Sequence, residues 1–403
     1  MVNVQLLKGF RDFLPSVVKK REYVLNTLKK VFESYGFEPL ETPSLEYEEI
    51  LTGKYGDEGD KLMYKFKDLG GRNVALRYDQ TVPLARVIAK YAPRGDAGQN
   101  ELPIPFKRYQ IQNVWRAENT QKGRYREFLQ VDIDTVGVYS PLADAEILSL
   151  VYKSYSALGL KIKIVINDRK QLSNIDNKYL MSIDKVGKIS EQKIIKELEA
   201  KGLSVNEAEE TFNKIKSMPK PDSVEIVEKI FQEMGNPKDT LRYVPVLIRG
   251  LDYYTGLIFE VLIENQKNTL SFGGGGRYDN LIGIFAGRDI PAVGFSFGFD
   301  RLIEAMEELK LFPKNLNGNN VFVAFSSSDL QEKALEITIK LRAENIASEF
   351  YLEDASLEKQ LKYADKKQVP YSIIVSDKEL IFKDMEKRIQ EVLSLEDIIK
   401  KLK

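Results

Sequence analysis

The stretch from Val114 to Gly137 reads VWRAENTQKGRYREFLQVDIDTVG and predicts two strands joined by a basic loop. The first strand ends at Trp115, and alternating apolar residues mark the second: Phe128, Val131 and Ile133. The loop region holds four basic residues, Arg116, Lys122, Arg124 and Arg126. Because guanidinium groups pair bidentately with phosphate oxygens, such a loop suits a polyphosphate ligand. A solvated, charged hairpin is the alternative interpretation of the same pattern.

The composition limits the chemistry that the chain can perform. Its 403 residues, 43% hydrophobic and 30% charged, are typical of a globular protein with more than one core. Lys and Arg balance Asp and Glu at 60 each, so a nucleic-acid partner must be bound by local basic patches. The absence of cysteine and histidine excludes disulfides, zinc-thiolate sites, thiol nucleophiles and imidazole bases. Catalysis therefore depends on carboxylates, cations, phenols or the substrate itself.

The N-terminal region carries no targeting or membrane signal. The first residues, MVNVQLLKGFRDFLP, contain neither a signal-peptide apolar region nor a cleavage site, and no apolar run reaches transmembrane length. We therefore expect a cytoplasmic protein without a membrane partner.

The first third of the chain predicts a helix followed by short strands. Apolar residues recur at helical spacing between Val17 and Tyr35, and Gly36 ends that helix. The next segment, FEPLETPSLEY, predicts a strand that lies at a sheet edge or enters an interface, because proline cannot donate to a ladder. A hairpin is predicted around Gly70 and Gly71, and its second strand ends at LRYDQT, where Asp79 and Thr81 place a carboxylate and a hydroxyl together.

The middle of the chain changes character twice. A helix over 141–158 and a strand over 161–167 precede a highly charged, helical segment, which predicts an inserted module. Strands are then predicted at residues 243–248, 257–264 and 270–272. The four glycines Gly273 to Gly276 indicate either close approach of a ligand to the backbone or a tight loop. A further strand over 291–299 is followed by a helix with Arg301 at its start, which suits an anionic ligand.

These patterns together predict an α+β catalytic domain with a mainly antiparallel sheet, followed by a C-terminal α/β domain. The alternation of strands and helices after residue 320 indicates the second domain, and no glycine-rich phosphate fingerprint follows its first strand. The expected boundaries are 1–168 and 241–310 for the catalytic domain, 169–240 for the helical insertion, 311–320 for a linker and 321–403 for the last domain.

Six ordered motifs resemble those of histidyl-tRNA synthetase, a class II aminoacyl-tRNA synthetase. They are YGFEPLETPSLE, LRYDQTVPLAR, WRAENTQKGRYREFLQ, RGLDYYTG, GGGGRYDNLIG and AVGFSFGFDRL, which begin at residues 35, 76, 115, 249, 273 and 292. RGLDYYTG and GGRYD single out the histidine-specific member of the class. The resemblance covers essentially the whole chain and implies an anticodon-binding C-terminal domain and a homodimer built partly on the Pro43 segment.

The resemblance also implies a role for individual residues. For ATP, it places Arg116 at the α-phosphate, Glu118 and Phe128 at the adenine, and Arg301 on the other face of the adenine near the γ-phosphate. The implied catalytic residues are Arg249, Arg116 and Arg124. The histidine site would comprise Asp79, Thr81, Arg116, Gln130, Asp134, Arg249, Tyr253, Tyr254 and Tyr278. Gln121 would meet the acceptor end of the tRNA. No protein-held metal is expected, and Mg²⁺ would bridge phosphates of ATP.

The implied chemistry is compatible with a chain that lacks histidine. Amino-acid activation joins an ionised carboxylate to the α-phosphorus of ATP, which requires alignment and charge neutralisation rather than a general base. A non-catalytic paralogue, such as the regulatory subunit of ATP phosphoribosyltransferase, is the alternative. Such paralogues usually lack the arginine of RGLDYYTG and the anticodon-binding domain, and both features are present here. Asp79 and Asp134 stand where many bacterial members carry glutamate, which shifts the expected pocket by one methylene.

Overall fold

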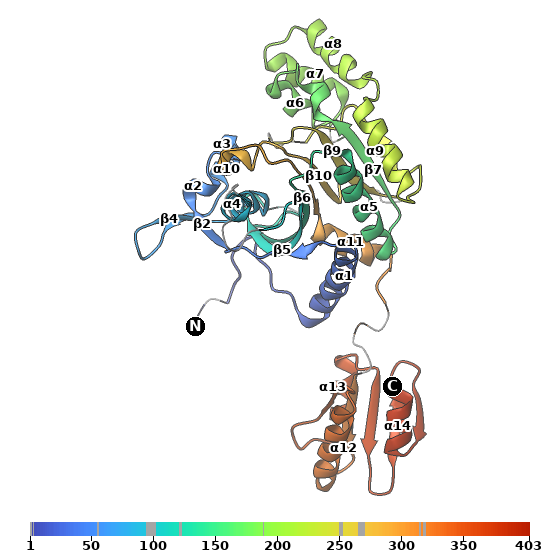
Figure 1. The fold of residues 1–403 in the computed structure, drawn as a ribbon. Coiled ribbons are helices and arrows are strands. Elements are labelled where there is room, and N and C mark those ends of the chain that lie inside the picture. The colour runs from blue at the N-terminus through green and yellow to red at the C-terminus, as the bar shows by residue number, and fades with distance from the viewer. Residues whose placement is uncertain are drawn as a thin grey trace. The chain divides into compact units, whose positions relative to one another are not determined.

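The computed structural model describes residues 2, 4–54, 56–93, 102–120, 123–187, 189–249, 253–264, 271–313, 316 and 320–403. It divides into two compact units, Met1–Leu311 and Phe312–Lys403 (Figure 1). Among the described residues, no helix combines the length and apolarity that crossing a membrane requires.

An eight-stranded sheet forms the centre of the first unit. Its order is β1-β5-β6-β11-β10-β9-β7-β8. The strands in this order are Glu38–Pro39, Phe106–Trp115, Glu127–Val136, Ala292–Phe297, Gly273–Arg277, Leu257–Ile263, Ile162–Asp168 and Leu241–Tyr243. The pairs from β5 to β7 are antiparallel, and only the edge strands β1 and β8 pair in parallel. The predicted mainly antiparallel sheet is confirmed.

The β5–β6 hairpin is the predicted pair of strands around the basic loop. Its register runs from Phe106 opposite Val136 to Trp115 opposite Glu127. Because side chains alternate between the faces of a strand, Val131 and Ile133 point to one face of the sheet while Gln130, Asp132 and Asp134 point to the other. One face of β6 therefore contributes to an apolar core and the other carries polar groups.

Four helices cover the apolar face of this sheet. They are α1 (Pro15–Ser34), α5 (Pro141–Ala157), α9 (Asp222–Glu233) and α11 (Phe299–Glu308), which contact one another in the pairs α1/α5, α5/α9 and α1/α11. Phe32 of α1 is fully buried, and its ring lies 5.6 Å from that of Tyr109 and 5.5 Å from that of Phe297. This packing leaves the other face of the sheet for the polar side chains.

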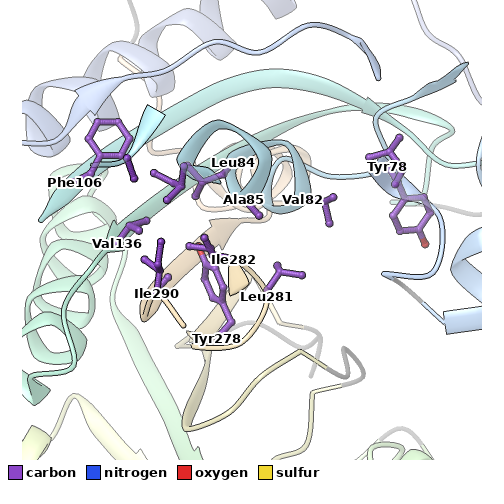
Figure 2. Packing of buried hydrophobic residues seen from close by; sticks show 14 of the residues in the cluster. Tyr78, Val82, Leu84, Ala85, Phe106, Val136, Tyr278, Leu281, Ile282 and Ile290 are labelled. Carbon is purple, nitrogen blue, oxygen red and sulfur yellow. The ribbon is translucent and has the colours of Figure 1, made fainter. Parts of the chain in front are cut away.

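A smaller sheet lies beside the main one, in the order β2-β4-β3. Its strands are Leu45–Tyr47, Asn73–Leu76 and Lys65–Lys67, and its accompanying helices are α2 (Glu48–Leu51), α3 (Gly56–Lys61), α4 (Thr81–Tyr91) and α10 (Gly283–Ala286). In Figure 2, Leu84 and Ala85 of α4 lie near Ile282 and Tyr278 in one apolar cluster. This cluster fixes the position of the segment that follows β10.

The helical insertion has a core of its own. It contains η1 (Arg169–Leu172), α6 (Asn177–Ile183), α7 (Glu191–Ala200) and α8 (Val205–Lys216). Buried Leu198, Phe212 and Ile215 belong to its cluster, and a capping box between Ser204 and Glu207 begins α8. The next helix, α9, packs on α5 and β7 instead, so it belongs to the cover of the main sheet.

Three predicted strands differ from those observed. FEPLETPSLEY forms two strands, β1 and β2, and Pro39 lies at the sheet edge as its missing N–H predicts. The strand predicted at 243–248 is wrong, because β8 ends at Tyr243. The carbonyls of Pro245 and Leu247 instead accept hydrogen bonds from the Asn167 side chain. The strand predicted at 270–272 is also wrong at Ser271 and Phe272, because the glycine run after them forms β10, and residue 270 lies outside the described residues. Glycine has a low strand propensity, but a side chain at these positions would clash with neighbouring residues, so the strand accepts glycine here.

The second unit is an α/β domain with a five-stranded sheet in the order β13-β12-β14-β15-β16. Its strands are Ser348–Phe350, Val321–Phe325, Tyr371–Val375, Leu380–Asp384 and Ile389–Val392, and its helices are η2 (Ser328–Leu330), α12 (Gln331–Ala343), α13 (Leu357–Lys366) and α14 (Leu395–Leu402). The first three strands pair in parallel, as the predicted alternation of strand and helix requires. This domain confirms the predicted fold class.

Candidate active site

A cavity of about 800 Å³ opens on the polar face of the main sheet. Every described residue that the sequence nominated for a site lines it: Asp79, Thr81, Arg116, Glu118, Arg124, Phe128, Gln130, Asp134, Arg249, Tyr253, Tyr254, Tyr278 and Arg301. Gln121, nominated for the acceptor end of tRNA, lies outside the described residues. The structure thus brings together side chains from five separate parts of the sequence. The contacts of each side chain indicate what it can do in the cavity.

One half of the cavity is acidic and deeply buried. Asp134 of β6 is 4% exposed, accepts a hydrogen bond from the Tyr278 hydroxyl, and forms a 2.7 Å ion pair with Arg108 of β5. Burial raises the pKa of the Asp134 carboxyl, while Arg108 and the Tyr278 hydrogen bond act in the opposite direction. Asp134 is therefore an anchored acceptor whose position is fixed by two partners.

Asp132 is a cavity residue that the sequence reasoning missed. Its carboxylate oxygens each lie 3.4 Å from the Gln130 amide nitrogen, which also lies 3.3 Å from the Ser296 hydroxyl. Burial raises the pKa of Asp132 to about 7, despite the opposing charge of Arg108. The alternation of side chains along the strand could have identified Asp132, because it places Asp132 on the same face as Gln130 and Asp134. Arg108, also missed, shares its strand face with Gln110 and Gln112.

Three tyrosines form the wall next to these carboxylates. The ring of Tyr253 lies 4.8 Å from that of Tyr254 and 5.8 Å from that of Tyr278, in tilted and edge-on arrangements. Tyr254 and Tyr278 are 8% and 2% exposed, and burial raises the pKa of the Tyr278 hydroxyl well above its usual value. The Tyr278 hydroxyl therefore stays protonated at neutral pH, and the wall suits a small planar ring with polar edges.

Arg249 crosses the floor of the cavity over the glycine strand. A Cβ at Gly274 would lie 1.6 Å from the Arg249 guanidinium, so any side chain at this position would displace the arginine. Arg249 forms a 3.0 Å ion pair with Glu260 and lies 5.7 Å from the Tyr254 ring centre. Gly294 likewise leaves room for Asp134, because a Cβ added at Gly294 would lie 2.0 Å from Asp134 Oδ1. The close approach predicted for the glycine run is thus made by a side chain of the protein.

The other half of the cavity is cationic and more open. Arg116 donates a 3.1 Å hydrogen bond to the Tyr78 carbonyl, and its guanidinium lies 4.5 Å from the Tyr78 ring and 5.2 Å from the Phe128 ring. Arg301 donates to the Ser271 carbonyl at 2.8 Å. Arg124 contacts Glu118 at 3.6 Å, and its side chain is 56% exposed. Three guanidinium groups that line one cavity, with Arg116 beside the Phe128 ring, suit a nucleotide with several phosphates.

Carboxylates on the cationic side are paired with arginines. Glu118 contacts Arg124 and Glu260 contacts Arg249, and within the described part of the chain no group of three or more Asp and Glu residues is arranged to hold a metal ion.

Comparisons with known proteins agree over almost the full length. Residues 9–175 and 168–302 match the family model for histidyl-tRNA synthetase, and residues 320–403 match that for an anticodon binding domain. The histidine–tRNA ligase of Christiangramia forsetii is 37% identical over 93% of this chain and 92% of its own, and that of Aeropyrum pernix is 40% identical over 92% and 90%. The solved histidyl-tRNA synthetase from Nostoc sp. PCC 7120 superposes with a TM-score of 0.83 at 28% identity, covering 100% of this chain and 99% of that one.

Proposed function

The chain belongs to the histidyl-tRNA synthetase family, and we propose that its cavity forms histidyl-adenylate with the side chains described above. Its activity is that of a histidine–tRNA ligase, an ATP-dependent class II aminoacyl-tRNA synthetase that joins histidine to tRNA. The assignment of single residues to histidine, ATP and tRNA is the proposal.

The main support for this proposal is that the cavity has an acidic, buried half and a cationic, more open half. On the buried side, Asp134 and Tyr278 face the imidazole, and Tyr254 closes the pocket around the ring. Asp79, Thr81 and Gln130 bind the α-ammonium group, because a carboxylate, a hydroxyl and an amide oxygen are acceptors for its three protons. Tyr253 packs behind Tyr254 and Tyr278 and sets the width of the pocket.

On the cationic side, Phe128 stacks on the adenine and Glu118 accepts from its edge, while Arg301 covers the opposite face and reaches the γ-phosphate. Arg116 and Arg249 hold the α-phosphate and the histidine carboxylate together, and Arg124 reaches between the carboxylate and the phosphates. The carboxylate oxygen then attacks the α-phosphorus, a bond to that phosphorus forms, and the bond to the β-phosphate breaks to release pyrophosphate. Both reactants are anions, so the arginines contribute mainly by alignment and by stabilising charge in the transition state.

The second step transfers histidine to tRNA. The terminal ribose hydroxyl attacks the carbonyl carbon of the adenylate, AMP leaves, and a phosphate oxygen of the adenylate takes the hydroxyl proton. Gln121 in the loop contacts the acceptor end, and the domain over 321–403 binds the anticodon, in agreement with its match to an anticodon binding domain. Mg²⁺ would enter with ATP and neutralise phosphate charge, and Glu260, a cavity carboxylate paired with Arg249, would lie near enough to contact it.

A homodimer and a cytoplasmic location complete the proposal. The segment around Pro43 borders a second, shallow cavity and exposes Leu45 and Tyr47 at 42% and 51%. Neighbouring exposed apolar side chains of this size are typical of a surface that another subunit covers. Sedimentation of the purified protein tests the dimer, and a concentration-independent monomer would contradict it.

The decisive test of activity is amino-acid-dependent exchange of pyrophosphate into ATP, measured with each of the twenty amino acids. We expect exchange with histidine and rejection of analogues that lack a ring N–H by about ten-thousandfold, because the buried partners of that N–H would be left unpaired. Absence of exchange with histidine would refute the proposal.

A further inference from the structure

The N-terminal segment from Gly9 to Phe13 lies against both walls of the cationic half of the cavity. The Gly9 carbonyl accepts a 2.9 Å hydrogen bond from the Arg126 amide, at the end of the basic loop. A Cβ on Gly9, whose φ is +89°, would lie 2.7 Å from side-chain atoms of Arg126 and of Thr120. The segment is therefore fitted to the loop at close range, and only glycine meets both demands.

Arg11 connects two elements that line the cavity. Its guanidinium lies 3.2 Å from the centre of the Tyr125 ring, which belongs to the basic loop, and 2.7 Å from Asp300 of α11. Tyr125 and Asp300 both line the cavity next to Arg124 and Arg301 respectively. A planar guanidinium can stack on a ring and pair with a carboxylate at once, which an ammonium group does less well.

Asp300 is held by two arginines. Arg21 of α1 pairs with its other oxygen at 2.6 Å, and the side chains of Arg21 and Asp300 are only 12% and 13% exposed. The ring of Phe13 lies near both guanidinium groups, 4.8 Å from that of Arg11 and 4.1 Å from that of Arg21. At this burial, a carboxylate beside Arg301 would oppose an incoming polyphosphate unless its charge were compensated.

We propose that the segment Gly9–Phe13 is a positioning element for the nucleoside triphosphate, with Arg11 as its central residue. Arg11 fixes the basic loop against α11, and together with Arg21 it neutralises Asp300, so that Arg124 and Arg301 remain directed at phosphates. Histidine binding does not depend on the segment, because the acidic half is held by Arg108 and Tyr278 instead. The inference rests on the proposed use of the cationic half for ATP.

Calorimetric titration of the full-length protein with ATP, and separately with histidine, tests this inference. For Arg11→Ala we expect ATP affinity to fall about tenfold, from the loss of one stacked and one partly buried ionic contact, with histidine affinity unchanged. Arg21→Ala is the matched control, since it removes an ion pair from the same carboxylate but keeps the Tyr125 contact, and we expect a smaller loss of about threefold. Arg11→Lys, which keeps the charge without the planar stack, should lie between these results.

A second pair of variants separates charge from position. In the Arg11→Ala background, Asp300→Asn should restore part of the ATP affinity, because it removes a carboxylate that has lost one of its two arginine partners. Equal losses of ATP and histidine affinity in Arg11→Ala, or unchanged affinities with only a lower melting temperature, would overturn the inference and leave the segment a structural anchor. Pyrophosphate exchange by the unaltered protein tests the proposed function independently, since its failure with histidine would not alter the measured affinity for ATP.

Discussion

The two halves of the cavity differ in how their charged groups are held. Arg108, Asp134 and Tyr278 are at most 4% exposed and are joined to one another by an ion pair and a hydrogen bond. On the opposite side, the Arg124 side chain is 56% exposed and contacts Glu118 at the longer distance of 3.6 Å. The acidic half, proposed to bind histidine (the histidine half), is therefore organised before binding, whereas the cationic half, proposed to bind ATP (the ATP half), keeps cations that a polyphosphate must order.

The backbone reflects the same difference. The acidic half stands on the centre of an antiparallel sheet, where Gly294 and Gly274 make room for Asp134 and Arg249. In the cationic half, Arg124 stands on a loop and Arg301 at the start of a helix, and the N-terminal segment packs against both elements through Arg11. Selectivity for a small ring needs a rigid frame, and a substrate with several phosphates tolerates a more adaptable one.

Of the changes predicted here, the largest is expected in the reaction rate when Arg249 is replaced, because Arg249 lies where the two halves of the cavity meet. Arg249→Ala should lower the rate of pyrophosphate exchange by about a thousandfold, because its proposed contacts to the α-phosphate strengthen in the transition state. Histidine affinity, measured by calorimetry without ATP, should change much less. A rate close to that of the unaltered enzyme would remove Arg249 from the reaction.

A smaller effect is expected for the pH dependence of stability. The pKa of Asp132 is raised to about 7 in the fold, above its ordinary value of 3.8. The folded protein therefore keeps a proton that the unfolded chain loses, and stability falls as pH rises from about 4 to about 7. Asp132→Asn removes this penalty, so the variant should gain about 2 kcal/mol more over the parent at pH 8 than at pH 5.

Urea unfolding at the two pH values measures that difference directly. Ser296→Ala serves as a comparison, because the Ser296 hydroxyl lowers the pKa of Asp132 and its loss should strengthen the pH dependence rather than abolish it. An advantage for Asp132→Asn that is equal at both pH values, or greater at pH 5, would contradict the assigned protonation.

The smallest effect is expected at the exposed end of the ATP half. Arg124→Ala should raise the KM for ATP about fivefold, and the difference should shrink with added salt, because exposed charges are screened. The KM for histidine should stay nearly constant. A salt-independent loss would indicate that Arg124 is buried by the bound substrates.

The sequence predicted most of the fold because its patterns were strong. Alternation in β6, helical spacing in α1 and the proline at the edge position of β1 each follow from a local rule that the structure obeys. The glycine run misled because local propensity favours a loop, whereas β10 is fixed by contacts with Arg249, Tyr254 and the Gly294 carbonyl. Such contacts join distant residues and leave no local pattern.

Only those residues of the candidate site that belong to a recognisable sequence motif could be predicted. Motif resemblance nominated residues such as Asp134 and Tyr278, which the structure places in contact. It gave no role to Asp132, to Arg108 behind Asp134, or to Arg11, whose partners Tyr125 and Asp300 are far away in the sequence. Pairings of this kind depend on the packing of the whole unit.

The division of the cavity is tested most directly by measuring KM for both histidine and ATP in a pair of variants, Asp134→Asn and Arg301→Gln. We expect Asp134→Asn to raise the KM for histidine about a hundredfold and to leave that for ATP within about twofold, because it leaves buried partners unpaired. Arg301→Gln should do the reverse. Comparable changes in both constants for either variant would contradict the division into a histidine half and an ATP half.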